Sequence, residues 1–362
     1  MKQPSSVRPR RVVFYPSLQK MVDNPYWVML ASGLREAGVE IAEEPESHKL
    51  LWLFKKRREV DILHLHYFQS LYCNSGHTRA RLIYVVKFAL YLLLARLLGY
   101  HTVLTLHNLK PTHPLKPGWI DFLGHWVAVN FSERVIVHCR EARRLLAARY
   151  GRKKKVYEVT HPNYIGYYPN QISQADARNK LNIPEIGRVF LFLGGVRPNK
   201  GIETLISAFH DLEGEDLILL IAGKADTNRD YANRLQALAN NDSRIRFHFG
   251  FIPDDELQVF YNACDIVVLP FTSILTSGSA ILAMSFAKPV IAPRMGCLPE
   301  LLEPDAGWLF EAGNQQSLHT TMKRVISEDF VQKGINAFKR ASDATKSQFI
   351  IQTIRAYNAD KN

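Results

Sequence analysis

The stretch GGVRPNKG, residues 194–201, sets an arginine and a lysine among glycines at the end of an apolar run. Residues 189–193 are continuously apolar, as expected of a strand buried on both faces. From Ile202 onward, apolar residues recur with the period of one helix face. A helix N-terminus carries unpaired N–H groups and partial positive charge, so cations are disfavoured there unless an anion binds. Arg197 and Lys200 therefore indicate an anion site, with an ordinary solvated turn as the alternative.

Histidine is the second residue type placed for chemistry. His107, in TLHN, follows a predicted strand, where a side chain can reach a ligand beyond the carboxyl end of a sheet. A single histidine at such a position is more often structural, so the residues alone leave its role open. Four weaker candidates occupy similar strand-end positions: His64, His66, His138 and His161.

No segment has the spacing of a metal site. The four cysteines are scattered, without a CxxC pair. Asp254 and Asp255 follow Pro253 and are expected to open a helix as capping acids. Arg197 and Lys200 can supply the positive charge that a bound cation would otherwise provide. The sequence therefore favours metal-independent chemistry.

The elements that position these residues alternate between strand and helix. Short apolar runs such as Val12–Tyr15 and residues 61–68 are followed by helical patterns, which predicts parallel sheets covered on both faces. The alternation pauses at the non-periodic residues 160–173 and then resumes. We predict an α/β chain of two doubly wound, Rossmann-like domains, residues 1–170 and 171–362, with ligands in the cleft between them. The last ~15 residues are expected to pack back on the first domain.

In the second half, four segments stand in the order and spacing of a known family. They are FLGGVRPNKGIETLISAF, IAGK, GFIPDDELQVFYNACDIVVLPF and TSGSAILAMSFAKPVIAPRMGCLPELL. The set resembles the donor domain of retaining glycosyltransferases, namely glycosyltransferase family 4, group 1 transferases of the GT-B fold. The resemblance is clear over residues 188–325 and weaker over the first half. The ordered set carries it, since no single segment is diagnostic.

The resemblance implies roles for the candidate residues. Arg197 and Lys200 match the two cations that neutralise the donor diphosphate, although the family's arginine usually stands where this chain has Gly195. The loop of Phe251 and Ile252 matches the one whose backbone reads the nucleobase. Glu300 follows a turn behind the donor site, where it either contacts the ligand or caps a helix. The diphosphate-binding loop then comprises Gly194, Gly195, Arg197, Lys200 and Gly201.

One departure from the family concerns two glutamates that contact the donor's sugar and ribose. This chain has Ile274 and Leu282 at the corresponding positions, and neither accepts a hydrogen bond from a hydroxyl. A nearby helix start offers hydroxyls in an anion-binding arrangement, with simple N-capping by Ser277 as the structural alternative. Its residues are Thr276, Ser277, Gly278 and Ser279. We expect a diphosphate held as in the family and a rearranged recognition of ribose and sugar.

The chain is strongly basic, with a formal net charge of +12 and dense basic runs at residues 8–11, 55–58 and 152–155. Without a nucleic-acid-binding module, these runs favour an anionic membrane surface over nucleic acid, and a solvated surface is the plain alternative. Residues 80–100 are apolar but interrupted by two basic residues, which predicts a mostly buried helix that does not span a bilayer, with an interfacial role as the alternative. The polar N-terminus lacks a signal-peptide core, which favours a cytoplasmic protein bound peripherally to the inner face of the plasma membrane.

The resemblance implies a glycosyltransferase, of hexosyltransferase type, that moves a sugar from a nucleotide diphosphate sugar with retention of configuration. His107 matches a family histidine that contacts the transferred sugar or stabilises its developing charge. The expected acceptor is a saccharide or polyprenyl-linked saccharide in surface or exopolysaccharide biosynthesis, and no cofactor is expected besides the donor. Two alternatives stay open: a nucleotide-sugar epimerase or hydrolase of the same fold, and a non-catalytic binding partner, which the missing glutamates would fit.

Overall fold

The computed structural model describes residues 10–21, 23–43, 49–73, 79–110, 114–225 and 229–359. Within it the chain forms two compact units. Unit 1 comprises Met1–Pro162 and Lys346–Asn362, and unit 2 comprises Asn163–Thr345. The first change of unit is thus at residue 162, where the sequence suggested residue 170, and the C-terminal segment is part of unit 1. Arg8 and Pro9 of the first basic run lie outside the described residues.

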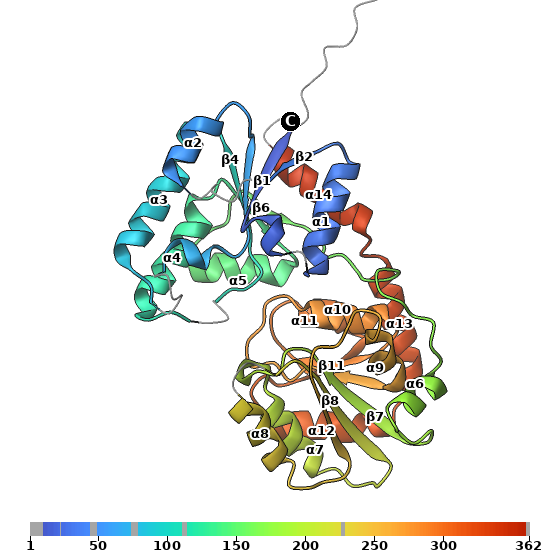
Figure 1. The fold of residues 1–362 in the computed structure, drawn as a ribbon. Helices are drawn as coiled ribbons and strands as arrows, with labels where there is room; N and C mark the ends of the chain where they lie inside the picture. Colours follow the sequence, from blue (N-terminus) through green and yellow to red (C-terminus); the bar gives the residue numbers. More distant parts are fainter. Residues whose placement is uncertain are drawn as a thin grey trace, which may run out of the picture. The chain divides into compact units, whose positions relative to one another are not determined.

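Unit 1 contains a parallel sheet with the strand order β2-β1-β3-β4-β5-β6 (Figure 1). Its strands are β1 (Arg11–Tyr15), β2 (Glu40–Ala42), β3 (Ile62–Leu65), β4 (His101–Thr105), β5 (Arg134–Val137) and β6 (Val156–Glu158). Because all these strands run in the same direction, their carboxyl ends form one edge of the sheet. The strand order reverses between β1 and β3, and the carboxyl edge at such a reversal is where doubly wound sheets bind ligands.

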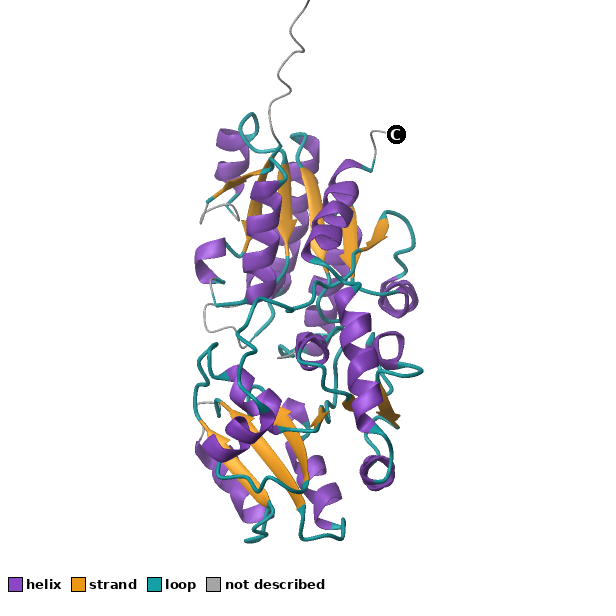
Figure 2. Cartoon of the chain, turned by 90° about the vertical axis from the view of Figure 1, so that its right-hand side faces the viewer, coloured by secondary structure: helices purple, strands orange, loops and turns teal. Residues whose placement is uncertain are grey.

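Helices cover both faces of this sheet (Figure 2). They are α1 (Pro25–Glu36), α2 (Leu50–Lys56), α3 (Leu82–Leu97), α4 (Gly118–Phe131), α5 (Arg140–Tyr150) and α14 (Lys346–Asn358), with the short turns η1 (Leu18–Lys20) and η2 (Phe68–Leu71). The crossovers from β2 through to β6 run in one direction along the sheet, so the right-handed rule puts α2, α3, α4 and α5 on one face. The crossover from β1 to β2 runs the opposite way, which puts α1 on the other face, where α14 packs beside it.

The C-terminal helix α14 completes the hydrophobic core on the α1 face. Phe349 and Tyr357 are buried there together with the strand residue Val12. The guanidinium groups of Arg10 and Arg134 donate to the carbonyl oxygen of Tyr357 at 2.6 and 3.0 Å. A single crossover helix cannot cover six strands, so this face depends on a helix from the far end of the chain.

Helix α3 differs from the mostly buried helix that the sequence suggested. Val85, Phe88, Leu92 and Ala95 face the core. Six other apolar residues of the helix are exposed: Leu82, Ile83, Val86, Leu90, Leu93 and Leu97. A helix that is apolar on its outer side as well marks an interaction surface. Among the described residues, no helix combines the length and hydropathy needed to cross a bilayer.

Unit 2 contains a second parallel sheet, in the order β12-β11-β10-β7-β8-β9. Its strands are β7 (Arg188–Leu193), β8 (Leu217–Gly223), β9 (Ile245–Phe249), β10 (Ile266–Val268), β11 (Val290–Pro293) and β12 (Gly307–Phe310). The order reverses between β10 and β7, so crossovers on the two sides of this reversal place their helices on opposite faces.

Two helical layers cover this sheet and bury two separate hydrophobic clusters against it. One layer consists of α7 (Ile202–His210), α8 (Arg229–Leu238) and α12 (Gln315–Ile326). The other consists of α6 (Gln174–Lys180), α9 (Leu257–Ala263), α10 (Gly278–Ser285), α11 (Leu298–Leu302) and α13 (Phe330–Ser342). Both units are therefore doubly wound α/β domains, and this part of the predicted fold class is confirmed.

Candidate functional site

The loop after β7 is the first part of the candidate site. It contains Gly194 and Gly195, a single 3₁₀ turn η3 (Pro198–Lys200), and Gly201 as the N-cap of α7. Gly201 has a φ of +71°, and a Cβ there would lie 2.0 Å from the carbonyl oxygen of Pro270. No other residue fits that contact without moving the backbone. The sequence predicted a direct turn from strand to helix, and the structure inserts η3 between them.

This loop is joined to the loop after β10, across the reversal in strand order. The hydroxyl of Thr272 donates to the carbonyl oxygen of Asn199 at 3.1 Å. The Lys200 ammonium lies 4.6 Å from the centre of the Phe271 ring. The predicted cations therefore stand at the position in the sheet where a doubly wound domain binds its ligand.

The electrostatics of the loop favour an anion. Arg197 is exposed and Lys200 is half-buried. Burial lowers the pKa of Lys200 below its ordinary value, and the positive charge of Arg197 lowers it further. Lys200 forms no ion pair within the part of the chain that the structure describes. A half-buried cation beside a second cation is stabilised by a negative ligand, which would raise the lysine pKa again.

The predicted nucleobase loop follows β9 at the same edge of the sheet. Phe251 is 75% exposed, whereas Ile252 packs against the core. The N–H of Gly250 donates to the carbonyl oxygen of Gly223 at 3.1 Å, which ties the start of this loop to β8. The loop thus has a fixed backbone and an exposed ring.

The hydroxyl-rich segment after β10 has a structural role at one position. Ser277 is the N-cap of α10, and its hydroxyl oxygen accepts from the N–H of Ala280 at 3.1 Å. The N-capping alternative is therefore confirmed for Ser277. Gly278 and Ser279 form the first turn of the helix. The hydroxyl of Thr276 lies 3.7 Å from a sulfur atom of the next loop, that of Cys297.

Glu300 lies at the carboxyl end of β11, in the first turn of α11, and is exposed. The N-cap position of that helix is Cys297, and Glu300 is the acidic residue of its first turn. Together, the candidate residues of unit 2 follow β7, β9, β10 and β11 and share one edge of the sheet.

The sequence did not single out Gly223, although it lies in the IAGK segment at the end of β8. Its φ is +135°, and a Cβ there would lie 1.9 Å from the carbonyl oxygen of Gly194. The N–H of Gly194 in turn donates to the carbonyl oxygen of Ala222 at 3.1 Å. Close approach of two backbones therefore fixes where the loop after β7 begins, and a glycine after an apolar run was the available signal.

In unit 1 the histidines gather at the carboxyl ends of four neighbouring strands. His66, His107, His138 and His161 follow β3, β4, β5 and β6, and His64 lies within β3. Successive ring centroids are 5.2 Å apart for His66 and His107, 5.7 Å for His107 and His138, and 5.3 Å for His138 and His161. The structure thus joins the principal and the weaker histidine candidates in one cluster.

His107 is fixed by aromatic neighbours and by one hydrogen bond. The Tyr67 ring stacks on it at 4.9 Å and 18°, and the Tyr26 ring meets it edge-on at 5.1 Å and 83°. His107 Nε2 lies 2.9 Å from His66 Nδ1. The sequence analysis did not name either tyrosine, because neither belongs to a strand-end pattern.

Burial keeps the five imidazoles neutral at physiological pH. It lowers the pKa of His64 and of His161 to about 3. It lowers the pKa of His138 to about 4. The pKa values of His66 and His107 fall well below the ordinary value, first through burial and then through the neighbouring histidines.

The proton positions follow from the hydrogen bonds. His66 Nε2 is buried without a hydrogen-bond partner in the described part of the chain. A buried unpaired N–H is rarer in proteins than an unpaired acceptor, which assigns the His66 proton to Nδ1, where it is donated to His107 Nε2. His107 then carries its own proton on Nδ1. On this assignment His107 is a neutral hydrogen-bond donor.

A hydrogen bond with the C-terminal helix α14 holds His64, whose ring lies beside His66. His64 Nδ1 lies 2.7 Å from the Tyr357 hydroxyl, and its Nε2 lies 2.8 Å from the Thr105 hydroxyl. The rings of His64 and His66 are 4.2 Å apart. Tyr357 and His64 are separated by 293 positions along the chain, so sequence patterns gave no sign of this support. Among the described residues, no group of His, Cys, Asp or Glu side chains has the geometry of a metal site.

Residues 173–345 match the family model described as glycosyl transferases group 1. The chain is 27% identical over 297 residues to a GDP-mannose:glycolipid 4-beta-D-mannosyltransferase from Xanthomonas campestris, covering 79% of this chain and 75% of that protein. It is 26% identical over 285 residues to a 2-deoxystreptamine glucosyltransferase from Streptomyces kanamyceticus, covering 76% and 70%.

Solved structures share the fold over nearly the whole chain. Sucrose-phosphate synthase from Thermosynechococcus elongatus matches with a TM-score of 0.77 and 17% identity, covering 98% of this chain and 99% of that one. Anabaena HepE, in complex with UDP-glucose, matches with a TM-score of 0.72 and 17% identity, covering 96% and 99%. These similarities confirm the predicted GT-B fold.

Removing the Lys200 charge tests the diphosphate loop. Lys200→Ala should weaken binding of a nucleoside diphosphate about 10- to 100-fold, since a charge-assisted hydrogen bond contributes roughly 1.5–3 kcal/mol. Binding of the nucleoside alone should change little, and Arg197→Ala should behave similarly. Calorimetry measures both ligands, with Lys323→Ala, an exposed lysine of α12, as the matched control. Equal losses for nucleoside and diphosphate would show that the loop shapes the fold and does not bind phosphate.

The neutral histidine cluster predicts acid sensitivity of unit 1. Above the ordinary histidine pKa of 6.5, neither the folded nor the unfolded state binds these protons. Between that value and about pH 4 the unfolded state binds these protons and the folded state does not. Lowering the pH through this window therefore lowers the free energy of unfolding by up to ~1.4 kcal/mol per pH unit for each histidine.

Urea unfolding of a Trp308→Phe variant measures this effect, because the other four tryptophans lie in unit 1. His138→Gln should reduce the pH dependence by about one proton. A free energy of unfolding that does not change across this window would contradict the neutral cluster.

Proposed function

Because residues 173–345 form a glycosyl transferases group 1 domain within a GT-B fold, we propose that this glycosyltransferase moves a hexose from a nucleotide diphosphate sugar to a lipid-linked saccharide. The observation that carries the proposal is the cation pair Arg197 and Lys200, set at the strand-order reversal of that domain. A diphosphate is the part of such a donor that two cations recognise.

Recognition of the remaining donor differs from the family pattern. Ile274 and Leu282 stand where the family has glutamates, and both pack against the hydrophobic core of unit 2. They therefore leave ribose and sugar hydroxyls to other groups. Thr276 and Ser279 offer two hydroxyls in the segment after β10, where the Ser277 oxygen already caps α10.

The chemistry requires one bond to break and one to form. The bond between the sugar's anomeric carbon and the diphosphate oxygen breaks, and Arg197 and Lys200 stabilise the negative charge that develops on the diphosphate. The acceptor hydroxyl oxygen forms the new bond, and its proton passes to the departing diphosphate. His107 contributes a neutral N–H to a sugar oxygen, which orients the sugar without adding positive charge beside a developing oxocarbenium ion.

The acceptor half of the proposal rests on the surface of unit 1. Helix α3 packs against both α2 and α4 (Figure 1). All three helices carry exposed apolar side chains. Leu51 is 74% exposed, Leu97 84% and Trp119 60%. The basic run at residues 55–58 follows directly at the end of α2. Apolar helices flanked by lysines and arginines bind anionic membrane surfaces, and the name of the Xanthomonas relative includes a glycolipid.

Three finer features of the proposal are open to direct measurement. The sequence resemblance implies retention of configuration, whereas the Xanthomonas relative is named a 4-beta-D-mannosyltransferase, so the anomeric configuration of the product must be read by NMR. We also propose that transfer needs neither a divalent metal nor a cofactor, so it should persist in a chelator. The role in surface polysaccharide assembly depends on identifying the acceptor.

Ligand screening tests the function. Calorimetry with UDP, GDP and their sugars should show one preferred base, and the preferred sugar nucleotide should support transfer to a lipid-linked saccharide. The relatives leave the base open, since one is named for GDP-mannose and another structure holds UDP-glucose. Hydrolysis or epimerisation without any acceptor would favour an epimerase or hydrolase. Absence of nucleotide binding would favour a non-catalytic partner protein.

His107→Ala should depress transfer while leaving donor binding nearly intact. A contact made mainly in the transition state contributes roughly 10²- to 10³-fold in turnover. Substitution by alanine also removes ring volume from the cluster, so a melting curve must first show that the variant is folded. His107→Gln keeps a donor group and should recover part of the rate. Transfer at the wild-type rate by the folded alanine variant would make His107 a structural residue.

The exposed helices predict membrane binding with two components. The protein should sediment with vesicles that contain anionic lipid, and salt should release the electrostatic part, because charges are screened over ~8 Å at physiological ionic strength. Leu51→Ser combined with Leu97→Ser should abolish the part that survives 1 M salt, since each buried leucine contributes up to ~1.5–3 kcal/mol. Ile335→Ser, an exposed apolar residue of α13 in unit 2, is the control. No sedimentation of the wild-type protein at any salt concentration would exclude the membrane hypothesis.

A further inference from the structure

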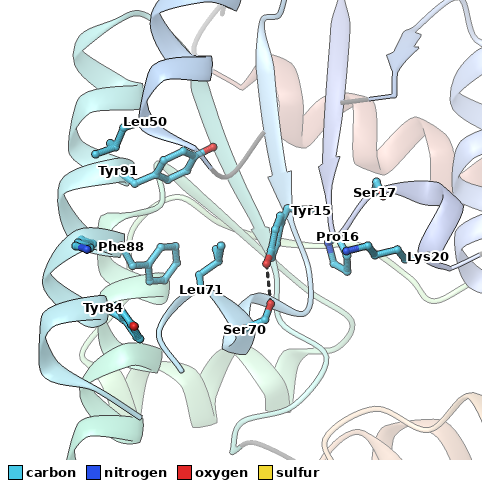
Figure 3. Close-up of a pocket in the computed structure, with 11 residues that line it drawn as sticks. Tyr15, Pro16, Ser17, Lys20, Leu50, Ser70, Leu71, Tyr84, Phe88 and Tyr91 are labelled. Atoms are coloured by element: carbon cyan, nitrogen blue, oxygen red, sulfur yellow. Dashed lines mark hydrogen bonds between the residues drawn. The ribbon is translucent and has the colours of Figure 1, made fainter. Parts of the chain in front are cut away.

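A pocket of about 560 Å³ lies at the carboxyl ends of β1 and β3 (Figure 3). Its walls come from the segment after β1, from η2 and from the side of α3 that carries Tyr84, Phe88 and Tyr91. The volume is in the range of small-ligand sites. None of the clustered histidines lines this pocket, so it is distinct from the His107 site.

The pocket occupies the strand-order reversal of unit 1. The Tyr15 hydroxyl, from the end of β1, lies 2.7 Å from the Ser70 hydroxyl, from η2 after β3 (Figure 3). The loops of the two strands on either side of the reversal therefore meet at the pocket floor. In unit 2 the same topological position carries the diphosphate-binding loop. Such a reversal is the expected ligand position of a doubly wound sheet, so the same position in unit 1 is expected to bind a ligand.

The charge of the pocket is positive. Lys20 and Lys87 line it, and none of the lining residues that the structure describes is acidic. Neither lysine forms an ion pair or hydrogen bond within the residues that the structure describes. The Lys87 ammonium lies 5.7 Å from the centre of the Tyr84 ring. Burial raises the pKa of Tyr15 and of Tyr91, so both pocket-lining hydroxyls stay protonated and add no negative charge.

The pocket is continuous with the apolar surface of α2 and α3. Leu50 is the first residue of α2, lines the pocket and is itself 42% exposed. Its neighbour Leu51 belongs to the exposed apolar surface described above. On α3, Val86 and Leu90 are exposed beside the pocket-lining Lys87. A ligand with an anionic group in the pocket can therefore lay a hydrocarbon chain along these two helices.

We propose that this pocket binds the phosphate group of a lipid-linked acceptor, with Lys20 and Lys87 as its cationic ligands and the exposed side chains of α2 and α3 against the lipid chain. The inference rests on the proposed function, because it identifies the acceptor as a phosphate-bearing lipid. It gives the basic charge of unit 1 a specific role beyond general attraction to the membrane.

Binding of decyl phosphate to the full-length protein tests the proposal. The probe is kept below its critical micelle concentration, and calorimetry measures its affinity in the absence of nucleotide. Lys20→Met with Lys87→Met should weaken binding about tenfold or more per lysine, since each removes a charge-assisted hydrogen bond to phosphate. Lys153→Met with Lys154→Met removes the same charge from exposed lysines at the amino end of β6 and should leave the affinity unchanged.

Inorganic phosphate and decanol separate the two parts of the ligand. Each should bind more weakly than decyl phosphate, because each lacks one of the two contacts. Equal binding of inorganic phosphate and decyl phosphate would overturn the lipid half of the proposal. Lys87→Glu reverses one exposed charge with little risk to folding, and it should weaken decyl phosphate binding more than Lys87→Met.

Nucleoside diphosphate binding, measured on the same variants, keeps this test separate from that of the transferase function. It should be unaffected by the Lys20 and Lys87 substitutions. Wild-type protein that binds nucleotide but not decyl phosphate would overturn the pocket proposal alone. Equal decyl phosphate affinity in the wild type and the Lys20/Lys87 variant would overturn it as well. Decyl phosphate binding without nucleotide binding would instead overturn the donor assignment.

Discussion

A parallel sheet must be covered on both faces, and much of this structure follows from that requirement. Backbone hydrogen bonds satisfy the strands internally, so the strand ends are the places where polar side chains and loops gather. In unit 2 the carboxyl edge holds Lys200 and the glycines that shape its loop. In unit 1 it holds the histidine cluster and the lysine-lined pocket. The same requirement explains helix α14, because without it the α1 face of the first sheet would be exposed to water.

The candidate sites of the two units differ in charge. The loop of unit 2 places two cations close together, where their repulsion is relieved by a bound anion. The cluster of unit 1 removes charge instead: four imidazoles are buried, that of His107 is half-buried between aromatic rings, and all five stay neutral. A leaving diphosphate needs positive charge, whereas a sugar that develops positive charge is better served by neutral donors and acceptors.

Helix α3 has apolar residues on both its buried and its exposed side. Its inner stripe, with Phe88 and Leu92, stabilises unit 1, and its outer stripe, with Leu90 and Leu97, is left exposed. Exposing six apolar residues of one helix to water is unfavourable unless another apolar phase covers them. The basic run after α2 and the unpaired lysines of the adjoining pocket favour an anionic lipid surface as that phase.

The sequence by itself determined the alternation of elements and the doubly wound class, and it predicted the position of a diphosphate-binding loop. These depend on local periodicity and on a glycine-bounded turn at Lys200, and both are properties of neighbouring residues. It also predicted a role for His107, because a strand end can be recognised in the sequence. Only the tertiary structure decided that the five histidines form one neutral cluster, since their rings meet through strand order and burial. It alone decided that Tyr357 supports His64 and that α3 is exposed on one side. Contacts between distant segments depend on which faces the whole fold covers, and no local pattern encodes that.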